Sequence, residues 1–224
     1  METTLDLLDL FKNIDIVLTE EQILKFERYK CELLVWNPRS NLISKNDESR
    51  IVERHFFESA ALVGLGLFNH ITSVLDLGTG AGFPGVPIKI IKPQITLTLM
   101  DSRKIKTLFL KNLVKELSLE NVSVVCERAE NLKNHQHMKN KFDVVLSRAV
   151  GDVTKVFQWA QPFLKKAGVF VTIKGTKLED ELQIFQAEFP SAIFSIIDFP
   201  SILKKGSRNQ KIVCVRNESL AKTI

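Results

Sequence analysis

Cysteine is scarce in this sequence of 224 residues, and its three cysteines lie far apart, at Cys31, Cys126 and Cys214. No two of them have the spacing of a zinc site or of a C-x-x-C redox motif, which excludes the usual cysteine-based forms of both. An odd count is typical of a reducing compartment, so we expect a cytoplasmic protein. The three side chains are then expected to be small hydrophobic groups in the core or at its edge.

Long apolar runs are also missing. The longest, Ser59 to Phe68, is too short to span a bilayer, and the first ten residues carry acids but no basic segment of the kind that opens a signal peptide. We therefore expect no membrane partner. Hydrophobic residues still make up 45% of the chain, enough for one large domain or a domain with a small appendage.

Positive charge is in moderate excess, with 31 basic and 26 acidic residues and a formal net charge of +5. Such a balance is compatible with a polyanionic partner such as nucleic acid, although charge alone does not distinguish that from a solvated surface.

The chain is predicted to divide into a helical region, residues 1–70, and an α/β region, residues 71–224. Helical spacing of Leu5, Leu8 and Phe11 predicts a first helix, and a capping box at Thr19 opens a second, which Pro38 is expected to end. A third helix is expected from about Glu48 to Leu65, ending at glycines.

Short β-branched runs then alternate with amphipathic segments. Strands are predicted at Ser73–Leu77, Thr96–Met100, Val122–Cys126, Phe142–Leu146 and Val169–Ile173, and helices at Pro84–Ile91, Arg103–Leu117, Val153–Leu164 and Leu178–Phe189. This alternation predicts a parallel sheet covered on both faces. The last two strands, Ala192–Phe199 and Lys211–Val215, are joined by too short a loop for a helical crossover, so they should pair antiparallel.

The stretch VLDLGTGAGFPGVP, Val74 to Pro87, contains G-x-G-x-x-G, the pattern of dinucleotide-binding loops. Two residues argue against a phosphate ligand. Asp76 would bring a carboxylate towards it, and Pro84 has no N–H to offer at the start of the helix. The sequence also lacks the Gly-Lys-Ser/Thr of a Walker loop. A nicotinamide-dependent oxidoreductase is therefore disfavoured, while a tight turn with a capping aspartate stays as a purely structural alternative.

A cationic cofactor without phosphate, S-adenosylmethionine, fits these residues better. Asp76 can accept a hydrogen bond from its ammonium or order a bridging water, and the glycines, Gly78 and Gly80 among them, let the backbone approach the methionine part. Asp101 ends the second strand, where its carboxylate can accept hydrogen bonds from both ribose hydroxyls. After the third strand, Ala129 and Glu130 can read the adenine edge.

Several motifs together resemble one family, the bacterial 16S rRNA guanine-N7 methyltransferases, also called glucose-inhibited division protein B. The matching stretches cover nearly the whole chain in order: Trp36-Asn37, Asn41-Leu42, Arg54-His55 with Ser59, Asp76 through Gly85, Leu99 to Ser102, Ala129-Glu130, Ser147-Arg148-Ala149 and Lys174-Gly175. One departure is Glu58, where the family usually has Asp.

The resemblance implies a Rossmann-like class I methyltransferase fold, with a mostly parallel seven-stranded sheet, an antiparallel C-terminal strand and an N-terminal helical cap. It implies cofactor contacts at Gly78, Phe83, Ala129, Glu130 and Arg148. It also implies a ribosomal RNA substrate, methylated at N7 of one guanine in 16S rRNA of the small ribosomal subunit.

Guanine N7 carries a lone pair and no proton, so its attack on a sulfonium methyl needs no general base, and positioning can supply most of the catalysis. We expect Ser147 and Arg148 at the reacting centre, with the backbone carbonyls there near the base. Arg148 is expected to bind the cofactor carboxylate, an RNA phosphate or guanine O6, and an ion pair with a structural carboxylate is the alternative.

RNA contacts are predicted at basic positions that can form a rim for phosphates, although a charge run is as often a solvated face. The predicted contacts are Lys174, Lys204, Lys205, Arg208, Arg54 and His55. His55 is equally compatible with a buried core histidine. No metal site is expected, because His135 and His137 have no third ligand in sight, and a monomer suffices.

Two alternatives for function stay open. A small-molecule methyltransferase would have a closed, apolar acceptor pocket beneath the helical cap, and a ribosome assembly factor could hold the cofactor without using it.

Overall fold

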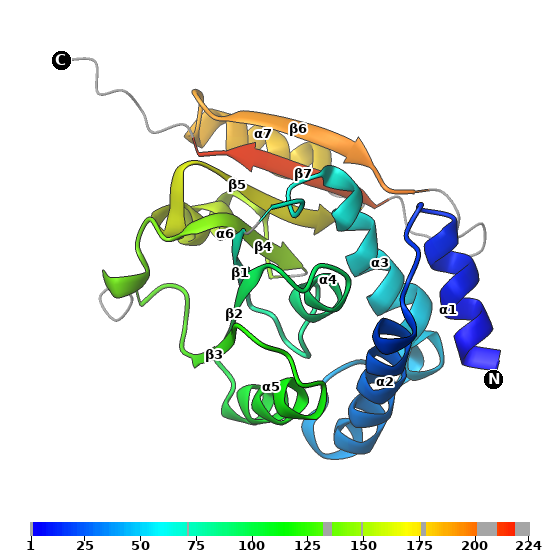
Figure 1. The fold of residues 1–224 in the computed structure, drawn as a ribbon. Helices are drawn as coiled ribbons and strands as arrows, with labels where there is room; N and C mark the ends of the chain where they lie inside the picture. Colours follow the sequence, from blue (N-terminus) through cyan, green and yellow to red (C-terminus); the bar gives the residue numbers. More distant parts are fainter. Residues whose placement is uncertain are drawn as a thin grey trace.

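A seven-stranded sheet runs through the middle of the structure, with strand order β3-β2-β1-β4-β5-β7-β6 (Figure 1). The structure is a computed structural model that describes residues 2–70, 72–131, 136–148, 150–175, 178–200 and 210–217. The strands are β1 Ser73–Leu77, β2 Thr96–Asp101, β3 Val122–Cys126, β4 Phe142–Arg148, β5 Leu164–Lys174, β6 Ile193–Asp198 and β7 Lys211–Arg216. The first five are parallel, and β7 lies antiparallel between β5 and β6. The predicted sheet and its antiparallel end are confirmed.

Helices cover both faces of this sheet (Figure 1). On one face α4 (Gly85–Ile91) and α5 (Lys104–Glu116) pack with the N-terminal helices, and their core includes Val74 and Leu97. On the other face α6 (Val153–Ala160) and α7 (Leu178–Glu188) pack on side chains that include Leu75 and Phe170. The alternation of neighbouring β1 residues between the two cores follows from the period-two geometry of a strand.

The N-terminal region begins with α1 (Glu2–Lys12) and α2 (Glu20–Ser40). The predicted capping box is present, since the Thr19 hydroxyl accepts from the Gln22 amide at 3.3 Å and the Gln22 side chain accepts from the Thr19 amide at 2.9 Å. The prediction that Pro38 ends this helix is wrong. Proline removes one N–H and crowds the preceding turn, but Pro38 lies only two residues from the end of the helix, where Ser40 adds a side-chain hydrogen bond to the Trp36 carbonyl.

The third predicted helix is helical but irregular. It consists of a 3₁₀ segment η1 (Lys45–Arg50), a π segment η2 (Val52–Phe57), one α-turn α3 (Glu58–Ala60) and a second 3₁₀ segment η3 (Ala61–Leu65). It starts earlier than predicted and ends before Gly66, which has a left-handed φ of 72°. Every residue from 55 to 63 is buried, and the changes in winding turn this continuous run of side chains towards different neighbours.

Two further predictions are corrected. α6 ends at Ala160 rather than Leu164, because Pro162 cannot continue it, and a 3₁₀ turn, η5 (Gln161–Phe163), leads directly into β5. Cys31 and Cys126 are exposed rather than in the core or at its edge, whereas Cys214 is half-buried and packs against the core as predicted.

The N-terminal helices and the sheet share one continuous core, because Phe11 and Phe26 belong to the same buried cluster as Val74 and Leu97. A division of the chain at residue 70 stays a prediction. Among the residues that the structure describes, no helix is both long enough and apolar enough to cross a membrane.

Candidate functional site: two cavities at the carboxyl ends of the strands

Two cavities open at the edge of the sheet where the parallel strands end, as expected for α/β folds. The first has a volume of about 400 Å³ and is lined by Gly78, by the ends of β2 and β3 and by Val150. The second, of about 440 Å³, is lined by Arg148, Gly151, residues 173–175 and several residues of the N-terminal region. Val150 lines the first cavity and Gly151 the second, so the segment after β4 runs between them.

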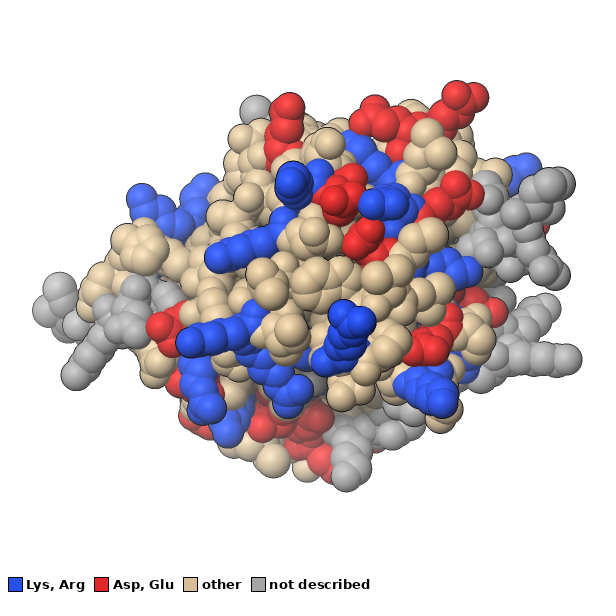
Figure 2. Space-filling view, turned by 90° about the horizontal axis from the view of Figure 1, so that it is seen from below, with Lys and Arg blue, Asp and Glu red and all other residues tan. Residues whose placement is uncertain are grey.

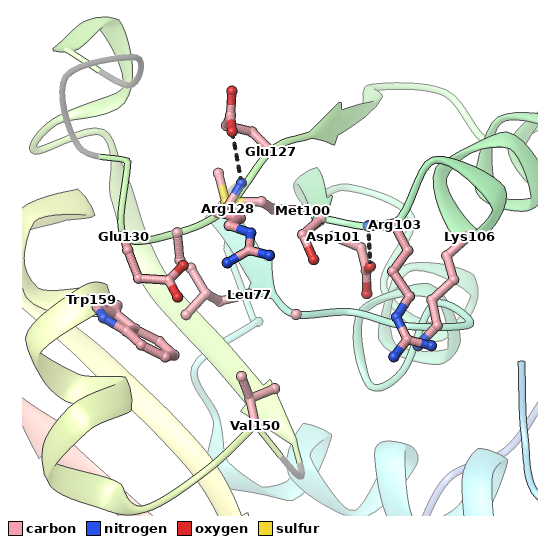
Figure 3. Close-up of a pocket in the computed structure, with 13 residues that line it drawn as sticks. Leu77, Met100, Asp101, Arg103, Lys106, Glu127, Arg128, Glu130, Val150 and Trp159 are labelled. Carbon is pink, nitrogen blue, oxygen red and sulfur yellow. Dashed lines mark hydrogen bonds between the residues drawn. The ribbon is translucent and has the colours of Figure 1, made fainter.

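The first cavity combines apolar side chains with both acidic and basic ones. Figure 3 shows Glu130 and Trp159 on one side of it and Asp101, Arg103 and Lys106 on the other. Its apolar lining comes from Leu77, Met100, Ala129, Val150 and Trp159. This combination suits a nucleoside, which has a flat apolar base and hydroxyl groups that donate hydrogen bonds.

Asp101 ends β2 and lies at this cavity while being almost fully buried. Its Oδ2 accepts from the Gly80 amide at 3.0 Å. Its Oδ1 accepts from the Arg103 amide at 2.9 Å, a bond drawn in Figure 3. Each carboxylate oxygen can accept a second hydrogen bond, so Asp101 is fixed in orientation and still able to accept from a ligand.

Asp76 is predicted from the sequence to contact the cofactor ammonium directly or through a water. In the structure it lines neither cavity. Its side chain is fully buried, and its Oδ2 accepts from the Thr79 hydroxyl and from the Gly85 amide, both at 2.7 Å. Its Oδ1 is buried without a hydrogen-bond partner. Burial raises the pKa of the Asp76 carboxyl to about 6, although both hydrogen bonds oppose this shift. Asp76 therefore holds the glycine loop onto the end of β1.

The amide groups of the glycine loop are largely used within the fold. Those of residues 78 and 79 donate to the Met100 carbonyl, that of Gly80 to Asp101, those of residues 82 and 83 to the Thr79 carbonyl, and that of Gly85 to Asp76. Pro84 has none. A phosphate cradle needs free amide groups converging on an anion, so this loop is unsuited to pyrophosphate.

Gly78 needs to be glycine for two reasons. Its φ of 70° disfavours any side chain, and an added Cβ would lie 2.6 Å from the Val150 side chain. Gly80 also has a positive φ, 62°, and lies beside Lys106. The glycine pattern thus reflects a tight loop packed between β1, β4 and α5.

Arg148, at the end of β4, lines the second cavity and not the first. Its guanidinium donates to the Arg54 carbonyl at 3.1 Å, lies 3.3 Å from Glu58 Oε2 and 2.8 Å from His55 Nδ1, and sits 5.0 Å from the centre of the Phe83 ring. Burial lowers the pKa of Arg148, and the Glu58 carboxylate partly restores it.

His55 is neutral in this setting. Burial and the neighbouring Arg148 lower its pKa to about 3. Because a guanidinium only donates hydrogen bonds, Nδ1 accepts from Arg148 and the ring proton lies on Nε2, which is buried without a partner. The ring stacks on Phe83 with centroids 4.6 Å apart, and Phe83 in turn stacks on Tyr29.

Phe83 therefore connects the glycine loop to the N-terminal helices and lines neither cavity. Glu58 is buried between two arginines, with Oε1 3.4 Å from Arg54 Nε and Oε2 on Arg148. Its longer side chain reaches both partners, so the departure from Asp leaves an ion pair in place here.

The other predicted residues are placed as follows. Arg54, His55 and Lys174 line the second cavity, where Lys174 pairs with Glu181 at 3.0 Å. Ser147 is buried within β4 and lines neither cavity. Lys204, Lys205 and Arg208 lie outside the described residues. Three further residues line the first cavity and are not predicted from the sequence: Arg103, Lys106 and Trp159. The first two immediately follow β2, which was a usable signal, whereas nothing in the local pattern marks Trp159.

Comparison with known proteins identifies the family. Residues 22–212 match the family model described as rRNA small subunit methyltransferase G. The chain belongs to this family. Proteins named ribosomal RNA small subunit methyltransferase G are 38% identical in Staphylococcus aureus, over 81% of this chain and 75% of theirs, and 36% identical in Oceanobacillus iheyensis, over 77% and 73%. The predicted family membership is confirmed.

Solved structures confirm the methyltransferase fold. A putative S-adenosyl-L-methionine-dependent methyltransferase from Methanococcus maripaludis matches with a TM-score of 0.56 at 14% identity, over 73% of this chain and 85% of that one. The TYW2 protein of M. jannaschii, solved in complex with AdoMet, matches with a TM-score of 0.52 at 15% identity, over 71% and 74%. As a member of the family, the chain is a methyltransferase.

Proposed function

We propose that this methyltransferase transfers a methyl group from S-adenosylmethionine to N7 of a specific guanine in 16S rRNA of the small ribosomal subunit. One observation carries the proposal: a nucleoside-sized cavity and a second, polar cavity adjoin at Val150 and Gly151. Methyl transfer needs a donor and an acceptor to meet in this way. The names of the family and of its curated relatives supply the rRNA substrate.

S-adenosylmethionine is the methyl donor, and the first cavity fits it. Asp101 would accept from the ribose hydroxyls, and residues 129–130 would lie against the adenine, beside the apolar surface of Trp159. When bound, the cofactor supplies an electrophilic methyl group on a positively charged sulfur. Asp76 supports this site indirectly, by holding the loop whose Gly80 amide orients Asp101.

The chemistry assigned to the chain is positioning. Guanine N7 has a lone pair and no proton, so the reaction needs no general base, and no described side chain has to remove one. Arg148 brings a positive charge close to the proposed reacting centre, but Glu58 offsets this charge and His55 and Phe83 hold the guanidinium in place. We propose that Arg148 and Ser147 belong to the reacting centre.

The second cavity favours RNA over a small apolar acceptor. Its lining includes the charged side chains of Asp47, Arg54, Glu58, Lys174 and Glu181, contrary to the apolar pocket expected of a small-molecule methyltransferase. Residues 1–70 would act as a cap that forms one wall of this cavity. Arg54 and Lys174 are proposed to contact the RNA, and the remaining basic positions predicted from the sequence stay proposals.

The test is transfer of labelled methyl groups to purified small subunits, to naked 16S rRNA and to a metabolite mixture. We expect label in RNA, recovered after digestion as 7-methylguanosine, and no further incorporation into subunits first methylated with unlabelled cofactor. Label in metabolites alone would support the small-molecule alternative. Binding of the cofactor without transfer to any substrate would support the assembly factor. Either result would contradict the proposal.

A further inference from the structure

Among the residues that the structure describes, three carboxylates line the second cavity, and two of them already have cationic partners. Glu58 is paired through one oxygen with Arg54 and through the other with Arg148. Glu181 accepts from the Val153 amide at 2.9 Å and lies 3.0 Å from Lys174 Nζ through the same oxygen. Both side chains therefore serve the fold around the cavity.

Asp47 is the third carboxylate, and it is held differently. It lies in η1 and is half-buried, and its Oδ2 accepts from the Ser44 hydroxyl at 2.7 Å. No ion pair joins it to any described residue within 4 Å. Burial opposes ionisation of Asp47, but the Ser44 hydroxyl and the nearby charge of Arg54 outweigh burial and lower its pKa. Asp47 thus presents an ionised carboxylate with Oδ1 and further lone pairs available to a ligand.

The position of Asp47 matters as well as its charge. The wall of the second cavity that belongs to the N-terminal region is formed by Asp47, Arg54, His55 and Glu58. None of the described residues of this region lines the first cavity. A guanine that turns N7 towards the first cavity must turn its opposite edge away from it. That edge carries the N1–H and amino N–H groups, two donors side by side that match the two oxygens of one carboxylate.

Resting on the proposed function, we propose that Asp47 recognises the acceptor guanine by accepting hydrogen bonds from its N1–H and its exocyclic amino group. This contact selects guanine over adenine, because adenine has an unprotonated N1 acceptor at this edge and would face the carboxylate with a lone pair. A site that hydrogen-bonds its substrate discriminates strongly against a base that lacks the matching donors. An apolar pocket discriminates less between ligands of similar shape.

The experiment uses small subunits reconstituted with 16S rRNA that carries either guanosine or inosine at the nucleotide labelled by the wild-type enzyme. Inosine keeps N7, O6 and N1–H but lacks the amino group. We expect kcat/KM of the wild-type enzyme to be about 10-fold lower on inosine, since a hydrogen bond to a charged acceptor contributes this much. Asp47→Ala should lower kcat/KM on guanosine about 10- to 100-fold. The variant should then have the same kcat/KM on guanosine and on inosine.

Three controls keep the result interpretable. Asp180→Ala removes an exposed carboxylate of α7 that does not line the cavity, and it should behave like wild type. Asp47→Asn keeps the size of the side chain but presents an amide N–H to the base, so it too should lose activity on guanosine. Both Asp47 variants should bind S-adenosylmethionine with unchanged affinity.

Wild-type enzyme that is indifferent to the missing amino group would overturn the assignment, as would an Asp47→Ala enzyme that discriminates between the two bases as wild type does. These results differ from failure of the proposed function, in which wild-type enzyme labels no RNA at all.

Discussion

At the scale of single residues, burial decides the roles of the charged groups in this protein. Asp76 and Arg148 stand at strand ends where a ligand contact is the natural expectation, and each instead meets other parts of the chain. Asp76 fixes a loop through Thr79 and Gly85, and Arg148 joins β4 to the helical region through Glu58 and His55. Neither partnership follows from sequence spacing, because residues 58 and 148 are brought together only by the tertiary fold.

Replacement of Asp76 by Asn is predicted to change the pH dependence of stability. The pKa of Asp76 rises from 3.8 to about 6 in the folded protein, so the folded state binds a proton more tightly than the unfolded chain. The resulting stabilisation is fully present below pH 4 and is lost as pH rises through 6, a change of about 3 kcal/mol. Urea unfolding of wild type and Asp76→Asn between pH 4 and 8 measures it.

Wild type must be compared with Asp76→Asn because His55 changes the stability of both proteins with pH, in the direction opposite to Asp76. Its lowered pKa makes the folded state less stable as pH falls below 6.5, in wild type and variant alike. The difference in unfolding free energy between the two proteins should therefore change across the window from pH 4 to 6 and stay constant above pH 7. A difference that does not depend on pH would contradict the buried-carboxylate interpretation.

At the scale of elements, the close fit of α4 to the end of β1 constrains the loop between them. α4 begins at Gly85, and a Cβ there would lie 2.7 Å from Asp76 Oδ2 and 3.1 Å from the Leu97 side chain. The sequence marks Gly85 only as the last glycine of a ligand-binding pattern. The structure gives it a packing reason that is independent of any ligand.

Gly85→Ala is predicted to lower the free energy of unfolding by about 1–3 kcal/mol, because the helix must move away from β1. The displaced loop should also weaken binding of S-adenosylmethionine, measured by calorimetry. Gly64→Ala is the matched control, since an added Cβ there meets nothing within 4 Å, and its effect should stay within about 0.5 kcal/mol. Equal effects of the two substitutions would show that the contact with Asp76 does not limit the site.

At the scale of the whole molecule, basic side chains are scattered over the face that carries α2 and α5, with uncharged surface and some acidic side chains between them (Figure 2). The two helices are joined by an Arg28–Glu116 ion pair and an Asn112–Glu32 hydrogen bond. Along α5, three exposed lysines, Lys104, Lys111 and Lys115, follow the helical repeat and pair with no described carboxylate. Arg103 directly precedes α5, Lys106 lies in its first turn, and both line the first cavity, so this face can guide a polyanion to the site.

Charge reversal of these three α5 lysines to Glu is predicted to raise KM for small subunits at least about 10-fold. It should also reduce the salt dependence of RNA binding, since each phosphate contact contributes about −0.7 to −0.9 to the slope of the logarithm of the binding constant against the logarithm of salt concentration. A matched control reverses three exposed lysines at the amino ends of β4 and β5, away from the cavities at the carboxyl ends: Lys139, Lys141 and Lys166. Affinity for S-adenosylmethionine should not change in either variant. Equal loss of RNA binding in both would indicate a general effect of net charge.

The sequence by itself determined the order and type of most elements, the strand-end location of the site, and the family. These depend on local periodicity, on turn residues and on motifs that are close together in the chain, all of which can be read in one dimension. β1 and β3, for example, have the predicted bounds. Two local features could not be predicted in this way. The helix continues past Pro38 to Ser40, whose side chain adds a hydrogen bond, and the buried run at residues 55–63 is irregularly wound because its side chains pack against several different neighbours.

Only the tertiary structure decided which of the predicted site residues meet. It places Asp101, Ala129 and Glu130 at one cavity, puts Arg148, His55 and Arg54 at another, and assigns Asp76 and Phe83 to the support between them. The physical reason is that a charged side chain removed from water must find a partner, and the available partner is set by packing across long sequence separations. Asp47 differs from the other two carboxylates of its cavity only through their cationic partners, which the tertiary structure sets.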